Sequence, residues 1–214
     1  MEVCSSDAEG ISCSVDDQAM DLAELADICA EKGFRIAYEN YCWATCAPTW
    51  KAVWEIVKKA NRPNLGLCLN TFQTAAGEFG DPTTRSGLIE EVNRAELESR
   101  WRNSLAELAA TVPAEKIFLL QISDAYKMDP PMESSSFGRT EASRSRWSHA
   151  YRPLPLDGGY LPVHVVLGAI LRTGFRGWLS VEVFDIGEEE RDFDIKKFTT
   201  SCMKSLEDLL FFSW

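Results

Sequence analysis

Positive charge is scarce in this sequence. Its 22 Lys and Arg residues stand against 33 Asp and Glu residues, which gives a formal net charge of −11. Binding to nucleic acid requires clustered Lys and Arg side chains that neutralise phosphates, and an anionic membrane surface attracts the same basic clusters. We therefore expect neither a nucleic acid nor a membrane as a partner.

Long apolar runs are lacking as well. No run approaches the length of a membrane span, and the first ten residues, MEVCSSDAEG, have neither a basic start nor an apolar core, so no signal peptide is expected. The seven cysteines are an odd number and lie mostly in apolar segments, which predicts reduced thiols in a cytoplasmic protein. Cys42 and Cys46 are four residues apart, but no second Cys or His pair completes a metal site, so a packing or loop role is favoured.

Helical patterns alternate with short, almost fully apolar runs. Such alternation is typical of an α/β fold, in which a parallel sheet is covered by helices. Strands are expected within 34–39, 65–70, 116–121 and 178–184, with a stub at 2–5, and helices within 17–31, 48–60, 94–111, 162–172 and 195–211. A long loop is expected over roughly 122–161.

Each of the four convincing strands carries one oxygen-bearing side chain at or near its carboxyl end. In parallel α/β sheets ligands bind at this edge. Two carboxylates and two amide oxygens form a set of hard oxygen ligands that suits Mg²⁺ or Mn²⁺, and a cation would compensate the buried acids. We therefore predict a metal site rather than a purely structural polar layer, formed by Glu39, Asn70, Gln121 and Glu182.

Five motifs carry a resemblance to a known family: YENYCW, LGLCLNTFQ, QISDAYK, HAYRPLPLDGGYLPV and RGWLSVEVF. Together they resemble fungal-type 3-dehydroshikimate dehydratase, of the xylose-isomerase-like superfamily of (β/α)₈ TIM barrels. The resemblance implies an incomplete barrel with parallel strands corresponding to roughly the fourth to eighth, in a single partial domain over 1–214. It also implies that the same four residues bind Mg²⁺, Mn²⁺ or Co²⁺.

Two departures from the family pattern have physical consequences. The second ligand is normally Asp, and Asn70 stands there, so the site loses one negative charge and metal affinity should fall. A complete barrel needs eight strands and typically about 250 residues. We expect an open half-barrel whose unpaired edges favour self-association, whether the chain is a truncated gene model, a truncated product or a subunit.

The reaction implied by the resemblance is the dehydration of 3-dehydroshikimate to protocatechuate, in quinate or shikimate catabolism. The metal would polarise the ketone, a base would remove the adjacent proton, and an acid would help the hydroxyl group leave. His149 is the candidate acid or base, and Gln73, Lys127 and Arg152 are candidate contacts for the carboxylate substrate. Ordinary solvated loop side chains are the competing interpretation for His149, Lys127 and Arg152.

Two alternatives to a dehydratase stay open at this point. One is a sugar or sugar-phosphate isomerase or epimerase of the same superfamily, and the other is a non-catalytic remnant. The QISDAYK and RPLPLDGGYLP segments favour the dehydratase, whereas Asn70 and the missing strands favour the remnant. For the isolated chain we expect dehydration far below the rates typical of enzymes, because one wall of the pocket would be absent.

Overall fold

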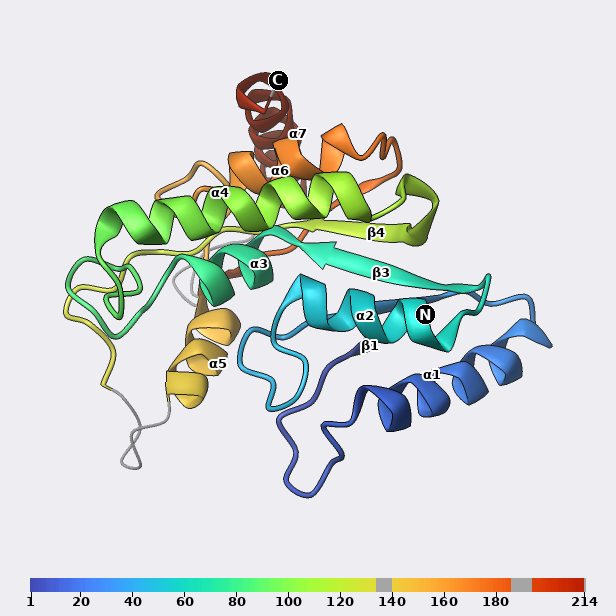
Figure 1. Ribbon diagram of the computed structural model, residues 1–214. Coiled ribbons are helices and arrows are strands. Elements are labelled where there is room, and N and C mark those ends of the chain that lie inside the picture. Colours follow the sequence, from blue (N-terminus) through green and yellow to red (C-terminus); the bar gives the residue numbers. More distant parts are fainter. Residues whose placement is uncertain (134–139, 186–193, 214) are drawn as a thin grey trace.

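The structure is a computed structural model that describes residues 1–133, 140–185 and 194–213. Five parallel strands form its main sheet. The strands follow one another in the order β1-β2-β3-β4-β6 (Figure 1). Their bounds are Glu2–Cys4 (β1), Ile36–Glu39 (β2), Leu65–Asn70 (β3), Ile117–Ile122 (β4) and Leu179–Val181 (β6). A separate antiparallel pair consists of Tyr151–Arg152 (β5) and Phe184–Asp185 (β7).

Helices connect the strands and pack along the sheet (Figure 1). They are Val15–Ala30 (α1), Trp50–Ala60 (α2), Thr71–Glu78 (α3), Arg94–Thr111 (α4), Thr140–Ala150 (α5), Val163–Arg172 (α6) and Ile195–Phe212 (α7), with a 3₁₀ turn at Ala114–Lys116. Side-chain caps from Ser14, Thr49 and Asn93 satisfy free backbone N–H groups at the starts of α1, α2 and α4. Within the described ranges, no helix is both long enough and apolar enough to cross a membrane.

The strands are apolar because helices cover the outer face of the sheet. Every residue of β2 and β3 is buried. The apolar faces of α2 and α6 pack into the same core, which includes the fully buried side chains of Trp50, Phe72 and Trp147. This burial supplies the main driving force for folding and brings the carboxyl ends of the strands to one edge.

The predicted parallel sheet, with its strands in sequence order, is confirmed. Over the described residues the sheet does not close into a barrel, and β1 and β6 are its two edges. Other predictions were wrong. The helix α3, directly after β3, is absent from the expected helices, and the loop expected over roughly 122–161 contains α5 and β5. The strand expected at 178–184 is interrupted after Val181.

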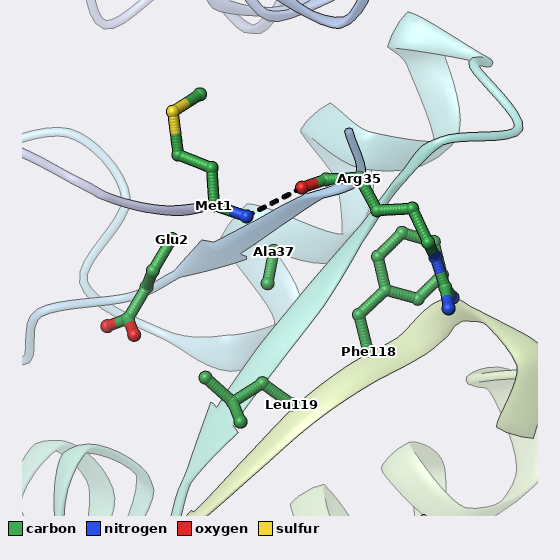
Figure 2. Close-up of a pocket in the computed structure, with 6 residues that line it drawn as sticks. All are labelled: Met1, Glu2, Arg35, Ala37, Phe118 and Leu119. Atoms are coloured by element: carbon green, nitrogen blue, oxygen red, sulfur yellow. Dashed lines mark hydrogen bonds between the residues drawn. The ribbon is translucent and has the colours of Figure 1, made fainter. Parts of the chain in front are cut away.

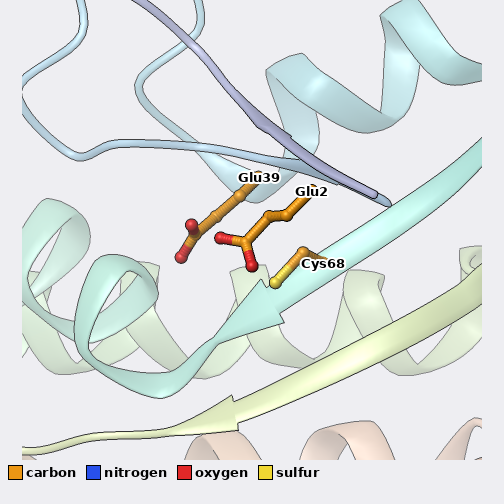
Figure 3. Close-up of side chains that lie close together, drawn as sticks. All are labelled: Glu2, Glu39 and Cys68. Atoms are coloured by element: carbon orange, nitrogen blue, oxygen red, sulfur yellow. The ribbon is translucent and has the colours of Figure 1, made fainter. Parts of the chain in front are cut away.

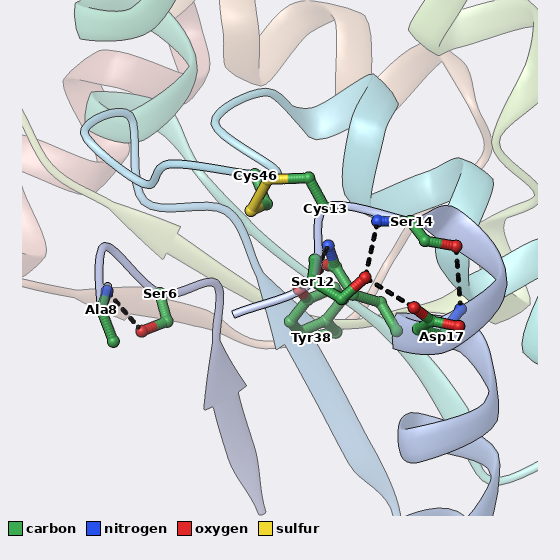
Figure 4. The surroundings of a disulfide bond; sticks show 9 residues. Ser6, Ala8, Ser12, Cys13, Ser14, Asp17, Tyr38 and Cys46 are labelled. Atoms are coloured by element: carbon green, nitrogen blue, oxygen red, sulfur yellow. Dashed lines mark hydrogen bonds between the residues drawn. A yellow bond between two sulfur atoms is a disulfide. The ribbon is translucent and has the colours of Figure 1, made fainter. Parts of the chain in front are cut away.

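The prediction that all seven cysteines are free thiols is wrong for two of them. Cys13 and Cys46 form a disulfide that joins the loop after β1 to the loop after β2 (Figure 4). Their Cα atoms are 4.8 Å apart, within the usual range for a disulfide, although the residues are 33 positions apart in the chain. The sequence pattern could not predict this pair because only the parallel packing of β1 against β2 brings the two loops together. Cys42 is a buried free thiol, in agreement with the packing role expected for it.

Candidate metal centre

Four polar side chains lie at the carboxyl edge of the sheet, each on a different strand or directly after one. Glu39 and Asn70 are the last residues of β2 and β3, Gln121 is the penultimate residue of β4, and Glu182 follows β6. The strand register places Asn70 opposite Gln121. Glu39, Asn70 and Gln121 are buried, and the side chain of Glu182 is 25% exposed. The parallel sheet thus brings all four predicted ligands to one edge.

Asn70 uses the two ends of its carboxamide differently. Its Oδ1 atom accepts hydrogen bonds from the backbone N–H groups of Phe72 (2.9 Å) and Gln73 (3.3 Å), so it caps the start of α3. Its Nδ2 atom donates to Glu182 Oε2 at 2.7 Å and to Gln121 Oε1 at 3.1 Å. The amide therefore turns a donor toward the other polar groups, and its oxygen is engaged by the helix.

Glu182 has a second partner in Arg152, which is 2% exposed. Arg152 Nη1 donates to Glu182 Oε2 at 2.9 Å. The guanidinium carbon lies 4.9 Å from the ring centre of Phe72 and 4.6 Å from that of Phe184. A buried cation between two aromatic rings therefore compensates the charge of Glu182.

Glu39 is far less well compensated. Its Oε1 atom is buried, and no residue within the described ranges donates a hydrogen bond to it. The nearest thiol, that of Cys4, lies 3.5 Å from Oε2. Burial, followed by the neighbouring carboxylates of Glu2 and Glu182, raises the pKa of Glu39 to about 9. The end of β2 thus holds a buried carboxyl oxygen without a donor among the described residues, on a group whose raised pKa favours the protonated form when no cation is bound.

A thiol and a second carboxylate lie beside Glu39. One ligand atom from each of Glu2, Glu39 and Cys68 falls within 4.8 Å of the others. Figure 3 shows the Glu2 carboxylate lying between Glu39 and Cys68. Cys68 is fully buried, and burial together with the two carboxylates raises the pKa of its thiol.

A pocket of about 360 Å³ adjoins this cluster on the inner face of the sheet (Figure 2). Arg35 stacks on the ring of Phe118 across the pocket, with the guanidinium carbon 3.5 Å from the ring centre. The lining residues are Met1, Glu2, Arg35, Ala37, Phe118 and Leu119. The carboxylate of Glu2, which is exposed, can therefore be reached from the inner face.

These donors fit a divalent cation in part. Glu39 offers an unpartnered buried oxygen, Gln121 offers Oε1, and Glu182 offers a carboxylate, all of them suitable ligands. Asn70 would have to give up its cap on α3 before its oxygen could join them. The role of Asn70 as a ligand stays a prediction, and so does that of the other three.

The remaining predicted site residues have different surroundings. Gln73 Oε1 accepts a hydrogen bond from the backbone N–H of Cys42 at 3.0 Å, and so holds the loop after β2. Lys127 is exposed and lies beside Gly87. His149 is exposed at the end of α5, with its ring 5.6 Å from that of Trp43 and 6.5 Å from that of Phe184. Their catalytic and substrate-binding roles stay predictions.

Sequence reasoning missed Glu2, Cys68 and Asp124. Glu2 lies in a stub of strand, and Cys68 lies in an apolar run that predicts only burial. Asp124, in the QISDAYK motif, is 2% exposed, and its Oδ1 atom accepts hydrogen bonds from the backbone N–H groups of Ala125 and Leu161. Burial raises its pKa to about 6. An acidic residue so soon after a buried strand was a usable signal.

Two curated relatives share the same name. The chain is 34% identical over 186 residues to a 3-dehydroshikimate dehydratase of Neurospora crassa, an alignment that covers 83% of this chain and 50% of that protein. It is 32% identical over 169 residues to a 3-dehydroshikimate dehydratase of Pseudomonas aeruginosa, covering 79% of this chain and 21% of that protein. The chain therefore spans about half of the fungal relative, and less of the bacterial one.

Solved structures agree with the fold. A xylose isomerase-like TIM barrel/4-hydroxyphenylpyruvate dioxygenase fusion protein superposes with a TM-score of 0.73 at 26% identity, over 97% of this chain and 27% of that one. The IOLI protein, solved with a bound zinc atom, superposes with a TM-score of 0.67 at 20% identity, over 100% of this chain and 64% of that one. The sequence model of the xylose isomerase-like TIM barrel family matches residues 12–198. This chain, with its parallel α/β sheet and polar edge, belongs to the xylose isomerase-like TIM barrel family.

Proposed function

We propose that this chain carries the site of a metal-dependent 3-dehydroshikimate dehydratase, which converts 3-dehydroshikimate to protocatechuate in quinate or shikimate catabolism. The observation that carries the proposal is the 34% identity to the fungal dehydratase over 83% of the chain. The chain also places Glu39, Gln121 and Glu182 at one edge of the sheet. Three relatives of this name, at 30–34% identity, support a dehydratase over a sugar isomerase or epimerase.

The metal ion would be held by Glu39, Gln121 and Glu182, with Asn70 as a weaker fourth partner. Mg²⁺, Mn²⁺ and Co²⁺ are the candidate ions. When bound, the ion supplies Lewis-acid polarisation of a carbonyl oxygen, which makes the adjacent carbon more acidic.

The residues of the chain would supply the binding and proton-transfer groups. Arg152 is the proposed contact for a carboxylate substrate: its Nη1 already donates to Glu182, but its buried Nε has no partner among the described residues and is free to donate. His149 is the proposed proton carrier. Its Nδ1 atom lies 2.7 Å from the backbone carbonyl oxygen of Ser145, which fixes the ring and leaves Nε2 for proton transfer. The rings of Trp43 and Phe184 adjoin His149 and would help to orient its imidazole.

The test is the formation of protocatechuate by the purified chain with Mn²⁺. We expect slow, metal-dependent turnover, below the range of about 1–10³ s⁻¹ typical of enzymes, because the sheet does not close into a barrel over the described residues. Glu39→Gln and Glu182→Gln should abolish it, whereas Glu55→Gln, an exposed change on α2, should not. The absence of product with Mg²⁺, Mn²⁺ and Co²⁺, or equal product from all the variants, would contradict the proposal.

A further inference from the structure

Glu182 and Glu39, at the two ends of the polar edge, differ in how well hydrogen-bond donors compensate their carboxyl groups. Glu182 already receives hydrogen bonds from Arg152 Nη1 at 2.9 Å and from Asn70 Nδ2 at 2.7 Å. Glu39, by contrast, has a buried oxygen without a donor among the described residues. A cation gains most where a buried carboxyl oxygen has no donor, as at Glu39 Oε1. Glu2 Oε2 accepts a hydrogen bond from Gln121 Nε2 at 3.3 Å, a contact that a bound ion would replace. The electrostatics therefore favour an ion on the β1–β3 side.

The strand register assembles three ligand groups at that place. Glu39 stands opposite Cys68 on β3 and opposite Cys4 on β1. Glu2 is two residues before Cys4, so its side chain lies on the same face of the sheet. The ligand atoms of Glu2, Glu39 and Cys68 all lie within 4.8 Å of one another. Tetrahedral bonds of about 2.0–2.3 Å would bring them to roughly 3.5 Å, which a rotation of the exposed Glu2 side chain can achieve.

The structure assigns a second kind of metal site to this chain: Glu2, Glu39 and Cys68 form a mixed carboxylate–thiolate centre for a borderline-soft divalent ion such as Zn²⁺ or Co²⁺. This thiolate site shares Glu39 with the metal site of the proposed function, and it rests on that proposal for the role of Glu39 as a ligand. A thiolate selects against Mg²⁺, which takes oxygen ligands. Three protein ligands with one open position match the pattern of zinc sites that keep an exchangeable position.

Binding of the metal ion releases the thiol proton of Cys68. As the bond between sulfur and the metal forms, the thiol proton of Cys68 passes to solvent, and the carboxyl groups of Glu2 and Glu39 bind as carboxylates. Gln121 Oε1 lies 3.3 Å from Cys68 Sγ and is placed to accept the thiol proton in a hydrogen bond when no ion is present. The thiol of Cys4 also adjoins the site, with Sγ 3.5 Å from Glu39 Oε2 and 3.9 Å from Glu2 Oε1.

Titration with Co²⁺ tests the site, because a thiolate bound to Co²⁺ gives a charge-transfer absorption band in the near ultraviolet that oxygen ligands do not give. The full chain, with its Cys13–Cys46 disulfide intact, should develop this band with one equivalent of Co²⁺ and lose it on addition of Zn²⁺. Cys68→Ser should abolish the band. Cys29→Ser removes a buried thiol on α1 and should leave it unchanged.

A second variant keeps the test decisive if Cys68→Ser fails to fold. Glu2 is exposed, so Glu2→Gln should fold normally and should weaken Co²⁺ binding at least 10-fold, with the band retained at saturation. Three results would overturn the assignment. They are no band in the unmodified chain, an undiminished band in Cys68→Ser, or a band that Cys4→Ser loses and Cys68→Ser keeps.

The test is independent of the dehydratase proposal. The band together with no formation of protocatechuate would leave the thiolate site standing and remove the proposed function. Mn²⁺-dependent dehydration without the band would support the proposed function and remove the thiolate site.

Discussion

At the scale of single residues, Asn70 sets the number of charged groups at the proposed metal site. Asn70→Asp should tighten Mn²⁺ binding at least about 10-fold, because it would add a charged oxygen ligand. In the absence of metal it should destabilise the fold near neutral pH, since two donated hydrogen bonds become contacts between acidic or acceptor groups at Glu182 and Gln121. Calorimetric titration and thermal melts of both forms measure the two effects.

Asn70→Ser is the matched control, because serine also caps helices but adds no charge. It should keep α3 and gain no affinity for Mn²⁺. Equal Mn²⁺ affinities of the unmodified chain and Asn70→Asp, or no binding by either, would mean that these residues form only a structural polar layer.

Glu39 should make the stability of the metal-free protein depend on pH. Its pKa is raised in the fold from 4.5 to about 9. The protonated carboxyl group therefore contributes its full share to the free energy of unfolding below pH 4.5, and this share is lost as the pH rises toward 9. Glu39→Gln removes the charge and should raise the free energy of unfolding at alkaline pH by at least about 1.4 kcal/mol, the value of one pKa unit.

Urea unfolding of both forms across this pH range measures the difference, without metal and with a chelator present. Glu55→Gln, in an exposed ion pair with Lys58, should follow the unmodified chain. A parallel decline of the unmodified chain and Glu39→Gln would remove Glu39 as the cause.

Sequence reasoning at this scale identified the residue types at the strand ends but not their hydrogen bonds. The alternation of helices and strands predicts that Glu39, Asn70, Gln121 and Glu182 share an edge. It cannot predict that the carboxamide of Asn70 turns its oxygen to α3, because this depends on α3 starting without an intervening loop. The apolar run around Cys68 predicts only that its thiol is buried.

At the scale of elements, Gly159 shows how a loop is fixed against the end of β4. A Cβ atom at this position would lie 2.2 Å from Asp124 Cγ. Asp124 in turn accepts the backbone N–H of Leu161, which leads into α6. Gly159→Ala should therefore cost about 1–3 kcal/mol of stability, the usual range for an overpacked site.

Chemical denaturation of Gly159→Ala beside Gly77→Ala is the measurement. Gly77 lies in α3, where a Cβ would meet Cys42 Cβ at 3.3 Å and where alanine favours the helix by about 0.5–1 kcal/mol. We expect its stability to change by less than 1 kcal/mol. An unchanged stability of Gly159→Ala would show that the loop gives way without cost.

Helices with an apolar stripe were predictable, and short elements were not. α2 and α6 follow from their spacing of Trp, Val and Leu, and α4 follows from a long run ended by Pro113. α5 has only weak amphipathic character, and its Trp147 is the main anchor, fully buried with its indole N–H donated to the carbonyl of Tyr126. Such a helix is set by tertiary contacts, which the sequence pattern does not carry.

At the scale of the whole molecule, we propose that the edges of the sheet favour self-association. β1 and β6 are the outer strands of the described sheet, and Trp178, directly before β6, is 89% exposed. Unpaired strand edges beside exposed apolar groups are templates for pairing with another chain. Sedimentation should show association that increases with concentration, and Trp178→Lys should weaken it. Met20→Lys, an exposed change on α1, should not. A monomer at all concentrations would contradict this proposal.

Anomalous X-ray diffraction from crystals of the chain grown with Zn²⁺ would locate a divalent ion at the Glu39 end of the polar edge. We predict an anomalous peak about 2.0–2.2 Å from a carboxylate oxygen of Glu39, the bonding distance for zinc and oxygen. A Glu39 carboxylate without a metal ion at bonding distance, in crystals saturated with Zn²⁺, would show that this residue does not hold the ion.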